Sequence, residues 1–331
     1  VFAPIYHEAR QRERGTRRQY CYYSQYASPL SDTLVDQGLD GKVVRPRIQH
    51  GFADMATKWA LHGALKPVLG DDLSLRAVAQ AYADAVEQHA AGRARLQETM
   101  RREIEESDDV SVVLLGRPYV CLDPAMHKGI PDIFGALDVK AFYMDMLDYD
   151  ETDVADLAEL LGQVHWHYAA KILESAFVVA KTPGLYPVLV TSFKCAPDSM
   201  TIEFVRRILD QAEKPYLILE LDEHDSSVGY ETRIEAAVRS FRNHRAGGAP
   251  EARSEPPAVS AGMHRLDGRT LFLPSWDRLS CTLMVAGLRR EGIDARLIVE
   301  DELTVQKGLR KNTGQCVPLH AIVEGFVEAV E

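Results

Sequence analysis

The sequence has no long hydrophobic run and no excess of positive charge. Its longest apolar stretches, such as residues 176–180, have the length of a strand, far short of the ~20 residues of a membrane-spanning helix. The 331 residues carry a formal net charge of −11, whereas surfaces that bind nucleic acid are basic. The composition therefore argues against a membrane protein and against a nucleic-acid partner. The arginines of residues 10–18 are a local exception that we interpret as a solvated loop.

The sequence is also poor in cysteine. Its five cysteines are an odd number, and no two of them have the CxxC spacing of a zinc knuckle or a thioredoxin site. This pattern argues against a secreted disulfide scaffold. The first residues lack the pattern of a secretory leader, so we expect a cytoplasmic protein. Residues 1–6 have instead the pattern of a strand, so we expect the chain to belong to a longer polypeptide.

No nucleotide-binding loop is recognisable, because the sequence contains neither GxGxxG after a strand nor a Walker motif. Gly116-Arg117-Pro118 ends an expected strand, and Gly129-Ile130-Pro131 opens an expected helix. Two interpretations stay open for this pair of turns. They form an anion cradle built from backbone amides and Arg117, or a structural turn between strand and helix.

Strand and helix patterns alternate from residue 110 onwards and predict an α/β fold with doubly wound, Rossmann-like (flavodoxin-like) parallel sheets in two to three lobes. We expect a partial N-terminal α/β lobe with a helical segment at 1–105 and a central Rossmann-like lobe at 106–245. A flexible linker at 246–264, rich in Gly, Ala, Pro and Ser, leads to a C-terminal βαβα unit at 265–331.

Several element boundaries follow from local signals. Ser28-Pro29 predicts the start of a helix that ends near Gly38, with Ser as the cap and Pro in the first turn. The apolar periodicity predicts two or three helices over 55–105 and one helix over 154–175. Buried strands are expected at 110–116, 139–146, 177–181, 187–192 and 216–220.

Three cysteines share one setting, a Gly- or Pro-marked break close to a helix-like run. They are Cys21, Cys195 and Cys316. If the fold gathers them, they form a soft thiolate site suited to iron–sulfur, and a helix N-terminus favours the thiolate. The alternative is that each is a small buried apolar residue. Cys281 lies inside an amphipathic pattern and is expected in a core, whereas Cys121 stays open as a fourth ligand.

Two charged or aromatic segments are less specific. Residues 220–224, which end in His224, followed by Glu231 and Arg233, suit either an acid–base or metal site or a network that orders a loop. His165 and His167 are two residues apart and would point to different helix faces, which is poor metal geometry.

Three segments are specific when taken together. They are Gly116-Arg117-Pro118-Tyr119 with Asp123-Pro124, Thr191-Ser192-Phe193-Lys194-Cys195-Ala196-Pro197-Asp198-Ser199, and Lys214-Pro215-Tyr216 running on to Glu231-Thr232-Arg233. These motifs resemble those of the acyl-CoA dehydratase activase-related proteins, which are similar to 2-hydroxyacyl-CoA dehydratase subunits and double-cubane cluster proteins. The resemblance covers nearly the whole chain.

The resemblance implies an iron–sulfur cluster, [4Fe-4S] or double-cubane [8Fe-9S], bound by cysteines between Rossmann-like lobes. It also implies a partner, an actin-like ATPase activator with its own [4Fe-4S] cluster, on the same or a separate polypeptide. A homodimer is an open alternative. The expected ligands are Cys21, Cys195 and Cys316, although Ala196 replaces the glycine of the family motif and His320 stands near the place of a further cysteine.

The expected function is that of an iron–sulfur protein of the 2-hydroxyacyl-CoA dehydratase superfamily. It would accept low-potential electrons from an ATP-dependent activator and drive reductive or dehydration chemistry on a small or CoA-linked substrate, as a radical lyase or a double-cubane-type reductase. Two rivals stay open, a non-catalytic electron-relay or scaffold module and a cluster-less α/β binding domain.

Overall fold

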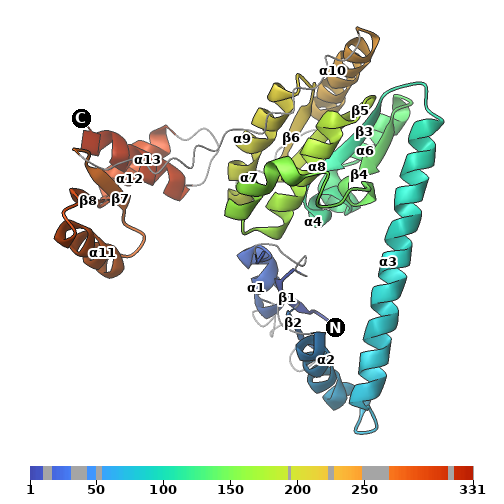
Figure 1. Cartoon of the computed structure of the whole chain (residues 1–331), viewed down its shortest axis with the longest axis horizontal. Helices are drawn as coiled ribbons and strands as arrows, with labels where there is room; N and C mark the ends of the chain where they lie inside the picture. Colours follow the sequence, from blue (N-terminus) through green and yellow to red (C-terminus); the bar gives the residue numbers. More distant parts are fainter. Residues whose placement is uncertain are drawn as a thin grey trace. The chain divides into compact units, whose positions relative to one another are not determined.

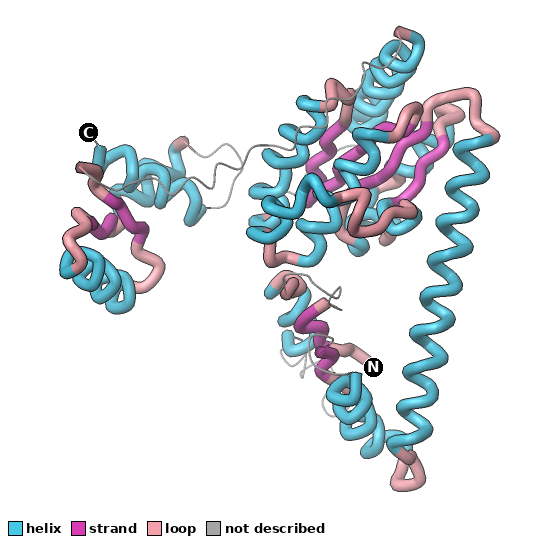
Figure 2. The backbone as a smooth tube through the Cα atoms, viewed as in Figure 1, coloured by secondary structure: helices cyan, strands magenta, loops and turns pink. Residues whose placement is uncertain are grey.

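The computed structural model describes residues 1–9, 17–30, 43–49, 54–192, 195–222, 227–247, 268–311 and 317–330. The chain divides into two compact units (Figures 1 and 2). The first contains Val1–Ser192 and Met200–Ala258, and the second contains Phe193–Ser199 and Val259–Glu331. The finer division at residues 105, 245 and 264 stays a prediction.

A four-stranded parallel sheet organises the first unit. Its strands are β3 (Ser111–Leu115), β4 (Lys140–Tyr143), β5 (Leu185–Ser192) and β6 (Leu217–Leu221). They lie in the order β4-β3-β5-β6, and every neighbouring pair is parallel. The chain therefore winds outward from the centre in both directions, which confirms the predicted Rossmann-like α/β class.

Helices cover the sheet on both faces. On one face a continuous apolar core joins β3, β5 and β6 to α4 (Pro118–Cys121), α6 (Ile130–Ala136) and α10 (Ser227–Ala246). On the other face α8 (His167–Lys181) contacts β3 and β5. All five residues of β3 are buried, as expected for a central parallel strand covered twice. Three further helices follow these strands in the sequence, α5 (Pro124–His127), α7 (Ala158–Gln163) and α9 (Ala196–Gln211).

The N-terminal part of this unit forms a smaller parallel pair, β1 (Ile5–Glu8) with β2 (Arg47–Gln49). Two helices follow, α2 (Asp54–Leu69) and the 31-residue α3 (Leu75–Glu105). Ser74 caps α3 by accepting a hydrogen bond from the amide of Ala77 (3.1 Å). The prediction of two or three helices over 55–105 is confirmed.

The predicted helix beginning at Ser28-Pro29 is wrong. Helix α1 instead spans Tyr22–Leu30, with Pro29 inside its last turn, and residues 31–42 lie outside the described part. The Ser28 hydroxyl donates to the carbonyl oxygen of Ala3 (2.5 Å) and so does not cap a helix. A Ser-Pro pair therefore marks the end of this helix, because the tertiary contact with Ala3 outweighs the local capping preference.

Two further expectations fail between β4 and β5. The helix expected over 154–175 is broken into the 3-10 turn Ala155–Leu157, α7 and α8, with residues 164–166 between the two α-helices. The strand expected over 177–181 is the end of α8. A short apolar run fits a buried helix as well as a buried strand, because in both settings every side chain faces the core.

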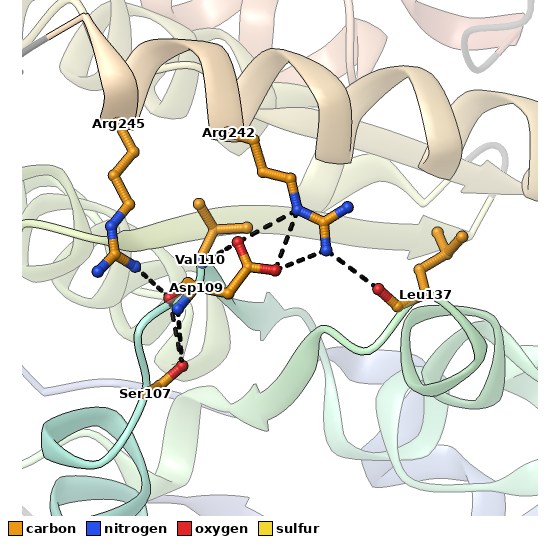
Figure 3. Close-up of polar contacts among 6 residues, drawn as sticks. All are labelled: Ser107, Asp109, Val110, Leu137, Arg242 and Arg245. Carbon is orange, nitrogen blue, oxygen red and sulfur yellow. Dashed lines mark hydrogen bonds and ion pairs between the residues drawn. The ribbon is translucent and has the colours of Figure 1, made fainter.

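An ion pair fixes the amino-terminal edge of the sheet (Figure 3). Arg242 of α10 bonds both carboxylate oxygens of Asp109, which precedes β3, with its shortest contact at 2.6 Å, and also donates to the carbonyl of Leu137 (3.1 Å). Arg245, one turn further along α10, donates to the main-chain oxygen of Asp109. These bonds lower the pKa of Asp109, chiefly through the hydrogen bond from Arg242.

The second unit contains a parallel pair, β7 (Leu271–Pro274) with β8 (Ala295–Ile298). Leu273, Val285 and Ala295 form its small apolar core beneath α11 (Arg278–Arg290). Helices α12 (Glu302–Arg310) and α13 (Val317–Val330) follow, and the sequence had not indicated α12. The expected βαβα unit is present, with this extra helix inserted.

Gly116 ends β3 at a point where β5 passes unusually close. An added Cβ would collide with the carbonyl oxygen of Val190 and would lie 2.6 Å from Sγ of Cys121. The collision partner is main chain in a central strand and cannot move aside cheaply. We therefore expect Gly116→Ala to lower the free energy of unfolding by about 3 kcal/mol, measured by urea denaturation.

Gly135→Ala is the matched control. Gly135 lies in α6 and nothing is within 4 Å of its added Cβ. Alanine favours the helix, so this variant should be neutral or more stable by up to about 1 kcal/mol. Equal losses of stability in both variants would contradict the close approach of β5 to Gly116.

Candidate functional site

The topology of the sheet indicates where a ligand would bind. The strand order reverses between β3 and β5, and ligands of open α/β sheets bind at the carboxyl ends of the strands beside such a reversal. Gly116 and Arg117 follow β3 directly, and Cys195 comes three residues after the end of β5. The Gly116-Arg117 motif thus follows one of the two strands that flank the reversal, and the Cys195 motif comes after the other strand in the sequence but belongs to the second unit.

Arg117 is buried at this edge, with 1% of its surface exposed. It precedes α4, where Pro118 occupies the first turn. Its positive charge acts on the hydroxyl of Tyr168 in α8. A buried guanidinium is costly without partners, so its presence here reflects specific polar surroundings and not simple packing.

The N-terminal segment 17–20 attaches to the same edge through a single parallel bridge. The amide of Gln19 donates to the carbonyl of His165 (2.8 Å), and the amide of His167 donates to the carbonyl of Gln19 (2.8 Å). This bridge occupies the break at residues 164–166 between α7 and α8. On its other side the segment bonds to the end of β1, because the amide of Tyr20 donates to the carbonyl of His7 (3.2 Å).

A buried ion pair supports this attachment. Arg18 donates to Oε1 of Glu174 (3.0 Å), and Glu174 is only 1% exposed. The Tyr149 hydroxyl donates to the other carboxylate oxygen (3.0 Å), and Lys171 lies 4.0 Å away. Each oxygen of Glu174 therefore has a partner, as a buried carboxylate requires.

Aromatic rings fill the junction around Tyr20. The ring of Tyr20 lies 5.9 Å from Tyr6, 5.2 Å from His167 and 5.7 Å from Tyr168, measured between centroids. Beside them Tyr22 meets Trp166 edge to face at 5.0 Å. We call Tyr6, Tyr20, Tyr22, Trp166, His167 and Tyr168 the junction cluster. Rings at these separations attract one another beyond their buried area.

Two phenols of the junction cluster, Tyr20 and Tyr168, hold their protons. Burial raises the pKa of Tyr168, and the nearby Tyr20 and Asp145 raise it further, whereas Arg117 acts in the opposite direction. Burial, followed by Tyr6, raises the pKa of Tyr20 as well. Both hydroxyls are therefore hydrogen-bond donors at neutral pH, and the hydroxyl of Tyr168 also feels the charge of Arg117.

Cys21 lies directly beside this cluster. Its thiol is free and buried, with 8% of the residue exposed, and its carbonyl accepts the first main-chain bond of α1 from Gln25 (3.0 Å). The setting inferred from the sequence, a break followed by a helix, is thus present. The helix is α1, and not the one expected after Ser28.

The other cysteines have contrasting settings. Cys195 is not in a disulfide, has intermediate exposure just before α9, and its carbonyl accepts bonds from the amide and hydroxyl of Ser199 (both 2.9 Å). Cys316 lies outside the described residues. Cys281 is fully buried in α11, which confirms its assignment to a core. Cys121 belongs to the apolar core under Gly116.

Convergence of Cys21, Cys195 and Cys316 stays a prediction. Cys21 belongs to the first unit and Cys195 to the second. Within the described ranges, no three His, Cys, Asp or Glu side chains are grouped so as to hold a metal ion. His224 also falls outside those ranges, and Arg233 donates to the main-chain oxygen of Ile218.

The sequence reasoning missed the role of residues 165–168. Two histidines two apart were judged only as metal ligands, and the segment was placed inside a helix. The available signal was the run of four ring-bearing residues, His165-Trp166-His167-Tyr168, beginning three residues after Gly162. Such a run suits a buried docking point better than the surface of a helix.

Residues 1–147 match the family model described as CoA enzyme activase uncharacterised domain. The match covers the N-terminal part, α2, α3, and the sheet as far as β4, including Gly116, Arg117 and Cys21. It supports a relation to an acyl-CoA enzyme activase-related family. No curated protein and no solved structure matches the chain. Across the described ranges no helix is long and apolar enough to cross a bilayer.

Removal of Arg18 tests the attachment of the N-terminal segment. In Arg18→Ala the carboxylate of Glu174 keeps Tyr149 and Lys171 but loses its closest cation. Breaking one side of a buried pair costs about 3 kcal/mol. We expect a matching loss in the free energy of unfolding and faster amide hydrogen exchange over residues 17–21.

Arg207→Ala is the matched control, because it removes an ion pair that is exposed to solvent. Arg207 and Glu203 pair on the surface of α9 with side chains 55% and 56% exposed. The expected loss is below about 1 kcal/mol, with exchange over residues 17–21 unchanged. Equal effects of the two substitutions would mean that the Arg18–Glu174 pair does not hold the junction.

Proposed function

We propose that this chain is an iron–sulfur protein related to the 2-hydroxyacyl-CoA dehydratases. It accepts low-potential electrons from an ATP-dependent activator and uses them in reductive or dehydration chemistry on a small or CoA-linked substrate. The observation that carries the proposal is the position of Cys21. Its buried free thiol follows Tyr20, whose ring packs against the junction cluster at the carboxyl edge of the sheet.

The donor atoms suit an iron–sulfur cluster. Neither Cys21 nor Cys195 is in a disulfide, and thiolate is the ligand that such clusters prefer. In the proposal these two residues and Cys316 hold the cluster. When bound, the cluster supplies single electrons and, with three protein thiolates, one iron open to a substrate oxygen.

In the proposal, other residues at the carboxyl edge of the sheet bind the carbonyl oxygen of the substrate. Tyr168 and Tyr20 keep their protons, and Arg117 keeps its charge, within a largely buried region. A carbonyl oxygen that gains an electron becomes more negative, and fixed donors and cations stabilise that charge best where water is excluded. Thioesters and small carbonyl compounds both provide such an oxygen.

The match of residues 1–147 to a CoA enzyme activase domain supports the same direction. An activase acts on a partner enzyme, and this chain shows no recognisable nucleotide loop. We therefore place ATP hydrolysis on a partner domain, an actin-like ATPase with its own [4Fe-4S] cluster. The isolated chain should bind no ATP.

Anaerobic reconstitution tests the cluster directly. The full chain should take up iron and acid-labile sulfide in equal amounts and show visible absorption that dithionite bleaches. Cys21→Ala should lose most of the bound iron because a ligand is removed, and Cys195→Ala should do the same. Iron is measured by mass spectrometry and sulfide by a colorimetric assay.

Cys281→Ala is the matched control, because Cys281 is buried in α11 and is not a proposed ligand. It should keep the iron content of the unchanged protein. Full iron content in both Cys21→Ala and Cys195→Ala would overturn the proposed ligand set. A protein that takes up no iron in any form would instead favour a cluster-less binding domain.

A further inference from the structure

Three titratable side chains meet at the amino-terminal edge of the sheet, away from the carboxyl edge. They are Tyr186 in β5, Lys214 just before β6 and His244 in the last turns of α10. The Tyr186 hydroxyl lies 2.9 Å from Nδ1 of His244, and the Lys214 ammonium lies 4.7 Å from the centre of the Tyr186 ring. We call these three residues the amino-edge cluster.

Lys214 contributes a buried cation. The residue is only 5% exposed, and its ammonium donates to the main-chain oxygen of Thr182 (2.7 Å). Burial lowers the pKa of Lys214 to about 8, because the charged form loses more hydration than the neutral form. The ammonium is still the main form at neutral pH.

His244 joins α10 to this cation. The ring of Tyr186 stacks on Phe241 of α10 at 4.6 Å, so the Tyr186–His244 bond closes a contact that already holds the helix. Nε2 of His244 is buried and makes no hydrogen bond of good geometry among the described residues, although the main-chain oxygen of Glu213 lies close enough to act on the ring. Burial lowers the pKa of His244, Lys214 lowers it further, and the main-chain oxygen of Glu213 opposes them.

The charges around His244 disfavour a second positive charge on its ring. Arg245 lies on the same turn of α10 and acts on Tyr186, while the carboxylate of Asp109 is bonded to Arg242 (Figure 3). Lys214 is the charged side chain that acts on the imidazole. Among the described residues, an imidazolium here would therefore stand beside an ammonium without a carboxylate of its own.

We propose that the amino-edge cluster is a proton-sensitive latch, which holds the end of α10 while His244 is neutral and releases it when the imidazole is protonated. The neutral ring can accept the hydroxyl proton of Tyr186 at Nδ1, whereas the protonated ring cannot. Protonation thus abolishes the hydrogen bond in which the Tyr186 hydroxyl donates to Nδ1 of His244, and it adds repulsion between the imidazolium and the Lys214 ammonium. In the sequence, α10 is the last described helix of the first unit before the second unit.

The free energy of unfolding depends on pH through His244 and Lys214, because the pKa of each is lower in the folded chain. Both take up a proton less readily in the folded chain than when unfolded. The stabilising effect of neutral His244 is complete above pH 6.5, the ordinary value for histidine, and is lost as the pH falls below it. Lys214 acts in a separate window, since stability rises with pH between about 8 and 10.5.

Hydrogen exchange on the full chain tests the latch. Amide exchange over residues 241–246 is compared between pH 7.5 and pH 5.5, with rates corrected for the intrinsic effect of pH. Opening should increase as the pH falls below 6.5, by at most tenfold per pH unit for one proton. In His244→Gln the glutamine keeps a hydrogen-bond acceptor but does not titrate, so this increase should vanish.

His89→Gln is the matched control, because His89 is an exposed residue of α3 and the substitution is the same. It should keep the acid-induced opening of α10. A second measurement needs no variant, since the NMR titration of His244 should have its midpoint below 6.5. A midpoint at or above 6.5, or equal opening in His244→Gln and the unchanged chain, would overturn the latch.

Lys214→Met tests the coupling between the two bases. Methionine keeps much of the side-chain volume and removes the charge, so the midpoint of His244 should move upward. An unchanged midpoint in a folded Lys214→Met chain would show that Lys214 does not act on His244 and would overturn the electrostatic basis of the latch.

Discussion

Two main-chain hydrogen bonds at Gln19 fix the geometry of the candidate site. They join a segment near the N-terminus to the break between α7 and α8, and each is 2.8 Å long. Because main-chain bonds admit little rotation, they set the neighbouring side chains in place as well. Arg18 reaches Glu174, Tyr20 reaches His167 and Tyr168, and Cys21 is carried to the same region. Without this bridge, the segment that carries Cys21 would have no fixed position relative to the start of α8.

One physical effect acts in opposite directions at the two edges of the sheet. Burial penalises the charged form of any group, so it raises the pKa of an acid and lowers that of a base. At the carboxyl edge this keeps Tyr20 and Tyr168 protonated and able to donate. At the amino edge it favours the neutral forms of Lys214 and His244. The first edge is therefore suited to receiving negative charge, and the second responds to protons.

Much of the fold could be predicted from the sequence, because the central strands carry continuous apolar runs punctuated by glycine. Gly116 and the two long helices before β3 were placed correctly on this basis. The failures have a common cause. Ser28-Pro29 and the break at 164–166 are decided by partners far away in the sequence, Ala3 and Gln19 respectively. Local sequence preferences do not encode contacts between distant residues. The junction cluster therefore could not be predicted from residue spacing alone.

The bridge between Gln19 and Trp166 also governs the order in which the chain can fold. The two residues are almost 150 positions apart, so the segment around Gln19 cannot complete its contacts until Trp166 has been synthesised. At roughly 5–20 residues per second this wait lasts about 7 to 30 seconds. During that interval Tyr20 and the buried thiol of Cys21 lack their native cover. Until α8 has been synthesised, the segment around Tyr20 exposes aromatic surface to which chaperones can bind.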